Sequence, residues 1–432
     1  MSLIKRFLLT ALVATYTMSA MAAEEPFDSL FTGRTLRADY TMTGGNGNFA
    51  ISLNHQATMP GWAGRRHHLS ELPLAGDAQL TMTDAATGDT LYRTSFSTLF
   101  HEWLSTPEAS ERARTFDHTV LLPEPRNDAR INLTFTDQRR EPMTSMAFTY
   151  SPADILVERL DNRPSLPYRY LHRSPLPADR AVDIAILAEG YTPEEMDSFY
   201  VHAQRAADEI LSYEPYKSRA DRFNIVAVAS PSTDSGVSVP RLADWKSTAF
   251  GSHFSTFYSD RYLTAPSVSL LHDALVNIPY EHIIVLANTD EYGGGGIYNS
   301  YTLTAARHPL MRPVVVHEFG HSFGGLADEY FYEGDVMEDS YPFDVEPWNP
   351  NITTLTDFDS KWKRLMPEGT PVPTDPKDAA KYPVGLYEGG GYSAKGVYRP
   401  ADECRMRNNS YPTFCVVCTD AIARLIDFYT QD

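Results

Sequence analysis

Two histidines and a glutamate occur at metal-binding spacing in the segment from Arg312 to Tyr330. His317 and His321 are one helical turn apart, so at about 100° per residue their imidazoles lie within roughly 40° of each other. Both rings can therefore reach one ion. Glu318 is offset by one position, where its carboxylate can reach water beside that ion. The pattern H-E-x-x-H is typical of a zinc site whose glutamate acts as a general base.

The chain around the two histidines predicts a helix that ends in a sharp turn. Pro313 suits the first turn of a helix, and Gly324 and Gly325 allow the positive φ values of a chain reversal. The reversal carries the following residues back towards the ion. A catalytic zinc takes three protein ligands and leaves a fourth position for water. We predict Asp328 as the third ligand, with Glu329 as the alternative, because the shorter side chain loses less conformational freedom on binding.

Residues after the turn are also expected to support the ligands: Glu329 or Tyr330 would contact them without binding the ion. A bare H-E-x-x-H can occur in an ordinary amphipathic helix, where both histidines are polar residues without a metal. Here an apolar run, a proline at the start, paired glycines and an acidic cluster after the turn accompany the motif. Together these features favour one catalytic Zn²⁺.

The string from His317 to Gly324 resembles the zinc helix of metzincin peptidases, and the longer string from His317 to Tyr330 is similar to the secreted IgA-metallopeptidase family. The resemblance covers essentially the whole mature chain and implies an N-terminal β-sandwich followed by a C-terminal zinc-peptidase domain. It also implies zinc on the two histidines and Asp328, with Glu318 as the catalytic base. The general metzincin pattern has a third histidine where this chain has Ala327.

The same resemblance implies a methionine-containing turn beneath the metal, and Cys404-Arg405-Met406-Arg407 is the candidate. Met406 would pack its thioether under the ligand histidines without binding the ion. Taken alone, one methionine in a loop is more often core filler. Tyr411 follows this turn and would lie near the cleft wall, where it is a candidate donor to a developing oxyanion.

Four consecutive glycines, residues 293–296, follow a buried-type strand. They lack the lysine and the spacing of a phosphate-binding loop. One interpretation is a flexible hairpin tip. The other is an edge strand at the cleft, where Gly294 and Gly295 offer backbone groups to an extended peptide, as metzincins generally do.

The sequence contains only three cysteines, Cys404, Cys415 and Cys418, within one fifteen-residue window. In an exported protein they predict one disulfide and one remaining thiol, with Cys404 paired to Cys415 or to Cys418. The alternative is a structural zinc held by three thiolates. A closed zinc site needs four ligands, and the sequence offers no evident fourth.

The hydrophobic pattern changes along the chain and predicts two domains. Residues 24–160 show short alternating strands between turn residues, typical of an antiparallel β-sandwich. Residues 161–180 are rich in proline and predict an extended linker. Residues 181–432 begin with the apolar strand Val182–Ala188 and a capping box at Thr192 and Glu195, typical of an α/β domain. The expected fold class is therefore α+β and multidomain, with a metzincin-like catalytic domain from the resemblance.

Residues 1–22 have the layout of a secretory signal, with a basic start, an apolar centre and the triplet Ala20-Met21-Ala22. The mature chain is therefore expected to be exported, either periplasmic or secreted. Beyond this segment no stretch approaches the roughly 20 apolar residues of a membrane span, so no transmembrane segment is expected. The formal net charge of −19 repels phosphate backbones and argues against a nucleic-acid partner.

These features predict an exported zinc-dependent endopeptidase that acts on a protein or peptide substrate, with Glu318 as general base. The alternative is a surface or periplasmic binding module whose N-terminal domain recognises a glycan or protein ligand and whose metal is structural. A structural zinc is closed by four protein ligands, which would leave Glu318 without a task. Fold and metal site do not define a particular substrate.

Overall fold

The N-terminal half is built from two four-stranded sheets. The computed structural model describes residues 26–177, 180–331 and 341–431, so the predicted signal segment 1–22 lies outside the described residues. The first sheet has the order β5-β1-β2-β8, with β1 (Phe31–Gly45), β2 (Asn48–Met59), β5 (Arg114–Pro125) and β8 (Glu158–Arg159). The second has the order β4-β3-β6-β7, with β3 (Ala78–Asp84), β4 (Thr90–Phe96), β6 (Ala129–Thr136) and β7 (Pro142–Tyr150).

The two sheets share one hydrophobic core. Along β6, Ile131, Leu133 and Phe135 are fully buried and the residues between them are partly exposed, as the sequence alternation predicts. Side chains of β1 and β5 pack in this core with side chains of β3 and β6. The short helices of this half are α1 (Phe27–Leu30), α2 (Leu99–Leu104) and α3 (Glu108–Glu111).

The C-terminal half contains a six-stranded sheet of order β13-β14-β12-β10-β11-β9. Its central strands run parallel to one another and are β10 (Val182–Glu189), β11 (Phe223–Val228), β12 (His282–Ala287) and β14 (Tyr301–Ala305). The edge strands β9 (Tyr168–His172) and β13 (Gly294–Ile297) are antiparallel to their neighbours. β10 and β12 are buried along their whole length, which explains their continuous apolar sequences.

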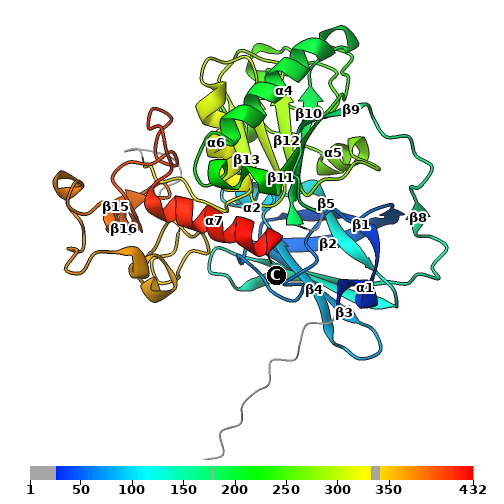
Figure 1. The fold of residues 1–432 in the computed structure, drawn as a ribbon, viewed down its shortest axis with the longest axis horizontal. Helices are drawn as coiled ribbons and strands as arrows, with labels where there is room; N and C mark the ends of the chain where they lie inside the picture. Colours follow the sequence, from blue (N-terminus) through cyan, green and yellow to red (C-terminus); the bar gives the residue numbers. More distant parts are fainter. Residues whose placement is uncertain (1–25, 178–179, 332–340, 432) are drawn as a thin grey trace, which may run out of the picture.

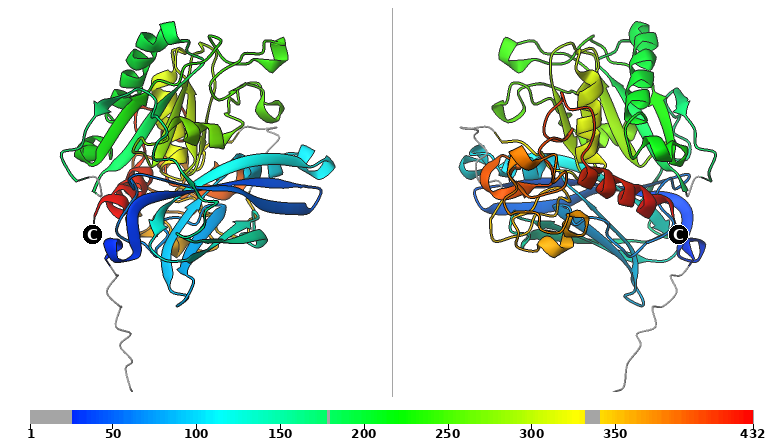
Figure 2. Two further views of the ribbon diagram at one scale, coloured as in Figure 1. Left: turned by 90° about the vertical axis from the view of Figure 1, so that its right-hand side faces the viewer. Right: turned by 60° about the vertical axis from the view of Figure 1, so that its left-hand side comes forward.

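Helices lie on both faces of this sheet (Figures 1 and 2). One core contains side chains of α4 (Met196–Ile210), α6 (Met311–Ser322) and α7 (Val416–Thr430). The core on the opposite face contains α5 (Val268–Ala274) and also residues of β2 from the N-terminal half. The predicted capping box at Thr192 and Glu195 is present just before α4. In the part of the chain that the structure describes, no helix is both long and apolar enough to cross a bilayer.

The proline-rich segment 161–180 is not wholly an extended spacer, which corrects that part of the prediction. Within it, β9 pairs antiparallel with β11 at the edge of the six-stranded sheet. Residues 168–172 contain no proline, so their N–H groups remain available for hydrogen bonds within the sheet. The segment between the two predicted domains therefore contributes an edge strand to the C-terminal half.

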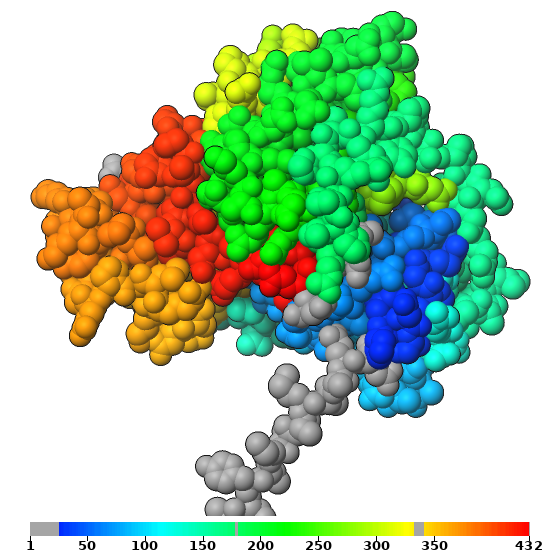
Figure 3. Space-filling model, in the orientation of Figure 1, coloured from blue at the N-terminus to red at the C-terminus, as the bar shows by residue number. Residues whose placement is uncertain are grey.

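Residues 341–400 form a lobe at one side of the molecule, orange at the left of Figure 3. The lobe contains the antiparallel pair β15 (Tyr387–Gly390) and β16 (Ser393–Arg399). From this lobe, α7 runs along the base of the C-terminal half towards the N-terminal sheets (Figure 1). Phe428 of α7 stacks on His68 of the N-terminal half with ring centroids 5.0 Å apart. Helix α7 therefore joins the lobe to both halves.

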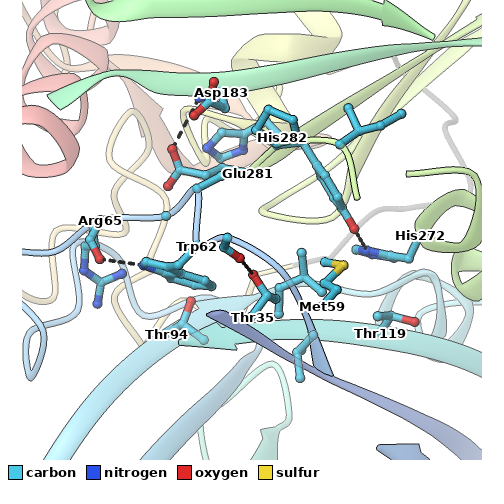
Figure 4. A pocket seen from close by; sticks show the side chains of 18 of the residues that line it. Thr35, Met59, Trp62, Arg65, Thr94, Thr119, Asp183, His272, Glu281 and His282 are labelled. Atoms are coloured by element: carbon cyan, nitrogen blue, oxygen red, sulfur yellow. Dashed lines mark hydrogen bonds between the residues drawn. The ribbon is translucent and has the colours of Figure 1, made fainter. Parts of the chain in front are cut away.

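A cavity of about 430 Å³ lies between the two halves (Figure 4). Trp62 and Arg65 line it from the N-terminal half, and Asp183, Glu281 and His282 line it from the C-terminal half. The Asp183 N–H donates to Glu281 Oε2 over 3.4 Å, which brings the two carboxyl side chains close together. Burial raises the pKa of Asp183 to about 7 and raises the pKa of Glu281 well above its ordinary value.

The buried Asp183 predicts a pH-dependent loss of stability. Its pKa is about 7 in the folded chain and about 4 in an unfolded chain, so folding favours the protonated form. Below pH 4 the buried Asp183 therefore costs no stability. The cost grows as the pH rises from about 4, and it is complete once the pH has passed the folded-state pKa of about 7. We expect Asp183→Asn to gain a few degrees in Tm relative to the wild type between pH 5 and pH 8, measured by thermal unfolding. The exposed Asp197→Asn is the control, and identical pH profiles for wild type and Asp183→Asn would contradict this account.

Candidate metal centre

Helix α6 carries the two predicted histidines and packs closely against the sheet. Pro313 lies in its first turn, as predicted, and Val314, Val315 and Val316 are buried. Val315 and Val316 belong to the hydrophobic core that also contains side chains of α4 and α7. The helix contacts β13, β14 and α4. A Cβ atom at Gly296 of β13 would lie 2.2 Å from the carbonyl oxygen of Glu318. Glycine at this position therefore allows the helix backbone to approach the strand.

Three electron-rich atoms converge between α6 and the segment that follows it. His317 Nε2 lies 3.1 Å from His321 Nε2, and Asp328 Oδ1 lies 3.1 Å and 3.3 Å from the two nitrogens. Metal–ligand bonds of about 2.0–2.1 Å in a tetrahedral zinc site place neighbouring ligand atoms about 3.3 Å apart. The three side chains therefore fit a tetrahedral ion and supply three of its four positions.

Backbone carbonyls orient both imidazoles. His317 Nδ1 donates to the carbonyl of Arg405 over 3.0 Å, and His321 Nδ1 donates to the carbonyl of Leu326 over 2.6 Å. Because each Nδ1 faces an acceptor, it carries the ring proton. In the neutral form of each ring, Nε2 then keeps its lone pair, which is the arrangement that metal-ligating histidines require.

Asp328 reaches the histidines after a chain reversal at Gly325, whose φ is 61°. Its Oδ1 faces the two ring nitrogens, and its Oδ2 accepts a hydrogen bond from the Tyr392 hydroxyl. Burial opposes a charge on Asp328, but the histidines hold the pKa of this carboxyl well below its ordinary value. Burial likewise opposes a positive charge on His321. The negative charge of Asp328 outweighs the effect of burial and raises the pKa of His321 to about 9. A buried carboxylate that keeps its charge beside two imidazoles attracts a cation.

Glu318 occupies the next position of α6, and its carboxylate lies against β13. A Cβ atom at Gly294 would lie 2.9 Å from Glu318 Oε1, so glycine at this position leaves room for the carboxylate. Burial raises the pKa of Glu318, while His317 and His321 act in the opposite direction. A carboxylate with raised proton affinity beside metal ligands is suited to general-base chemistry.

The predicted turn at residues 404–407 packs directly against α6. A Cβ atom at Gly320, one position before His321, would lie 2.7 Å from Met406 Sδ. Met406 is fully buried, and its carbonyl accepts a hydrogen bond of 2.9 Å from the N–H of Glu329. The preceding Arg405 supplies the carbonyl that orients His317. The turn therefore contacts the helix and also the segment that carries Asp328.

Gly294 and Gly295 lie on the edge strand β13, which replaces the interpretation of a flexible hairpin tip. β13 pairs with β14 on one side, and Gly294 also forms an isolated parallel bridge with Tyr262. The backbone N–H of Tyr411 donates to Asn408 Oδ1 over 2.9 Å, within the loop that follows the turn at residues 404–407. The roles of these residues towards a substrate stay predictions.

Two side chains that the sequence did not single out belong to the site. Tyr392, between β15 and β16, holds Asp328, and the Tyr330 ring packs edge-on against it with centroids 5.3 Å apart. Glu102 of α2, in the N-terminal half, accepts a hydrogen bond from the Tyr262 hydroxyl. Burial raises the pKa of Glu102 to about 8, and the charged groups of the metal centre also act on it. Neither residue lies in a local motif, because each reaches the site through long-range contacts.

Glu329, the alternative third ligand, lies apart from the histidines and beside the cysteines. Its Oε1 is 3.0 Å from Cys418 Sγ, and it forms a second group of candidate metal ligands with Cys404, Cys415 and Cys418. The three cysteines are free thiols, so the predicted disulfide is not formed. The sulfurs of Cys404 and Cys418 are 3.8 Å apart, well beyond the bonding distance of about 2.05 Å.

Two imidazoles and a carboxylate around one point, with a glutamate on the same helix, define the class of metal-dependent hydrolases. A family model described as IgA Peptidase M64 matches residues 171–383 and 376–426, and a model described as the Peptidase M64 N-terminus matches residues 26–147. The chain therefore belongs to the IgA peptidase M64 family, whose members are metallopeptidases. A comparison with curated proteins gives no significant match.

The hydrogen bond from Tyr392 predicts a role in holding Asp328 for metal binding. Tyr392→Phe removes the donor to Asp328 Oδ2 and leaves the ring contacts in place. Loss of such a supporting hydrogen bond lowers metal affinity about 10–100-fold. Competition with a chromogenic chelator measures the affinity, and Tyr398→Phe on the neighbouring strand β16 is the matched control. Equal affinities in the two variants would rule out this role.

The close approach of α6 to β13 predicts that Gly296 tolerates no side chain. In Gly296→Ala the new Cβ meets the Glu318 carbonyl and His321 Cβ, so the helix must move away. We expect a loss of about 1–3 kcal/mol in stability and weaker metal binding. In the control Gly390→Ala the nearest atom to the new Cβ is 3.6 Å away, an ordinary contact. Thermal unfolding and metal titration compare the two, and equal Tm values would contradict the packing argument.

Proposed function

We propose that this chain is an exported zinc-dependent endopeptidase in which Glu318 is the general base. The observation that carries the proposal is the convergence of His317 Nε2, His321 Nε2 and Asp328 Oδ1 within 3.3 Å, one helix position from Glu318. Membership of a metallopeptidase family supports peptide-bond hydrolysis. The small, nitrogen-rich donor set supports zinc, because imidazole and one carboxylate are its usual ligands in hydrolytic sites.

The ligand residues would hold the ion as neutral imidazoles and an ionised carboxylate. Asp328 is suited to this because its pKa is held well below the ordinary value. The carbonyls of Arg405 and Leu326 keep the ring protons on Nδ1, so Nε2 remains free to bind. When bound, zinc would polarise the scissile carbonyl and lower the pKa of a water molecule.

Glu318 would then move protons during the reaction. Its carboxylate accepts a proton from the attacking water, and the raised pKa that burial gives it favours this step. The same carboxyl then returns the proton to the nitrogen of the leaving amine. Gly294 leaves space beside Glu318 Oε1, so the group can reorient between the two transfers without meeting a side chain from β13.

The two halves support the finer fold assignment. Two four-stranded sheets around one core are consistent with a β-sandwich over residues 24–160. A helix with H-E-x-x-H beside an antiparallel edge strand, with Met406 packed under Gly320, is consistent with a metzincin-like catalytic domain over 181–432. Export, to the periplasm or the medium, rests on the signal-like segment 1–22. The proposed substrate is a protein or peptide.

Replacement of the general base tests this proposal. Glu318→Gln keeps the size of the side chain and removes its ability to accept a proton, so we expect turnover to fall about 10²–10⁴-fold. Metal content should stay unchanged because Glu318 is not a ligand. The assay follows cleavage of a broad peptide library by mass spectrometry, which also separates internal from terminal cleavage.

The exposed Glu194→Gln is the matched control and should retain wild-type turnover. Removal of metal by a chelator should abolish cleavage, and addition of Zn²⁺ should restore it. An unaltered rate in Glu318→Gln would refute the general-base assignment. Cleavage that persists after complete metal removal would refute the zinc mechanism.

A further inference from the structure

A second group of candidate metal ligands lies outside the histidine site. It consists of Glu329, Cys404, Cys415 and Cys418, whose ligand atoms all lie within 4.8 Å of one another. Glu329, Cys404 and Cys418 are completely inaccessible to solvent, and Cys415 is 8% exposed. A carboxyl buried beside three thiols needs a partner that offsets its desolvation.

The distance between sulfurs matches metal coordination. Zinc–sulfur bonds of about 2.3 Å in a tetrahedral site place two sulfurs about 3.8 Å apart. Cys404 Sγ and Cys418 Sγ are 3.8 Å apart. A disulfide between them would require the sulfurs to approach to about 2.05 Å and would leave Cys415 unpaired beside a buried carboxyl.

Backbone N–H groups point at the sulfurs as they do in thiolate metal sites. Cys404 Sγ accepts from the N–H groups of Met406 and Cys415 over 3.4 Å and 3.3 Å. Cys415 Sγ accepts from the N–H of Cys418 over 3.5 Å, at the start of α7. These N–H donors favour thiolate over thiol, because a negative sulfur is the stronger acceptor. The spacing Cys415-x-x-Cys418 is also the pair spacing typical of zinc sites.

Glu329 supplies the fourth donor that the sequence did not reveal. Its Oε1 accepts from Asn351 Nδ2 over 2.9 Å and lies 3.0 Å from Cys418 Sγ. Its Oε2 is buried and has no hydrogen-bond partner in the described structure. A buried oxygen without a partner beside three sulfurs is the atom that a cation would satisfy.

We propose that Glu329, Cys404, Cys415 and Cys418 bind a second, structural zinc ion, separate from the ion of the histidine site. Four protein ligands close this site, so it has no position for a substrate. The ligands come from three segments: the one that follows α6, the turn that contains Met406, and the start of α7. The ion therefore ties the residue next to Asp328 to the turn whose Arg405 carbonyl orients His317.

Metal content of a variant without the histidine site tests the proposal independently of peptidase activity. We expect the zinc-loaded full chain to contain two zinc ions, and His317→Ala/His321→Ala to retain one, both measured by mass spectrometry of metals after gel filtration. Cobalt substitution of the double variant should give an intense thiolate-to-cobalt charge-transfer band, which oxygen and nitrogen ligands do not produce. A double variant without bound metal, or a cobalt form without this band, overturns the proposal.

Substitution of the carboxylate identifies the fourth ligand. Glu329→Gln, in the background of the histidine double variant, should lower zinc affinity by at least about tenfold. Glu388→Gln on strand β15 is the matched control and should leave affinity unchanged. Equal affinities in the two variants remove Glu329 from the site and overturn the four-ligand assignment.

Thiol counting separates the metal site from a disulfide without relying on variants. In denaturant with a chelator, the wild-type chain should show three reactive thiols, and before unfolding zinc should protect them. One reactive thiol would indicate the disulfide between two cysteines and would overturn the proposal.

Discussion

The convergence of three electron-rich atoms on one point is the constraint on which the rest of the structure depends. A carboxylate oxygen and two ring nitrogens lie within 3.3 Å of one another in a buried site, so their positions must be fixed by other bonds before they can bind one ion. Carbonyl acceptors fix the rings of His317 and His321, and Tyr392 fixes Asp328. The glycines of β13 let α6 approach closely enough for its histidines to face the returning chain. Hydrogen bonds to backbone carbonyls and to Tyr392, together with the close packing of α6 on β13, therefore hold the three side chains in position for an ion.

Adjacent residues of one short segment serve two different centres. Asp328 faces the histidines of α6, whereas Glu329 faces the cysteines of the turn and of α7. The N–H of Glu329 donates to Met406, and the carbonyl of Asp328 accepts from Gly391 of the lobe. Movement of any of these segments therefore displaces both donor sets. The methionine turn, the cysteines and the segment that follows α6 therefore pack together around the C-terminal end of this helix. The proposed second ion would stabilise the positions of the ligands in the histidine site.

Local patterns in the sequence predicted much of the fold and part of the site. The helix with its histidines, the apolar strand predicted at Val182–Ala188 and the capping box before α4 each depend on neighbours within a few residues. The fourth donor beside the cysteines was not predictable, because Glu329 and Cys418 are 89 positions apart. Tyr392 and Glu102 reach the centre only through tertiary packing. Strand β9 was missed because the prolines on both sides of it dominate the composition of its segment.

The N-terminal half belongs physically to the centre, although its sequence carries no catalytic motif. The Ser97 N–H donates to the carbonyl of Tyr298, just beyond β13, and Asp77 accepts from the indole of Trp348 in the lobe. Ser97 lies two residues before α2, and the charged groups around the histidines act on Glu102 of α2. Burial raises the pKa of Glu102 to about 8, which favours the neutral form of this carboxyl near Glu318 and Asp328. A neutral carboxyl at this position leaves the negative charge near the histidines to Glu318 and Asp328, so the packing of the two halves helps to set the charge around the metal centre.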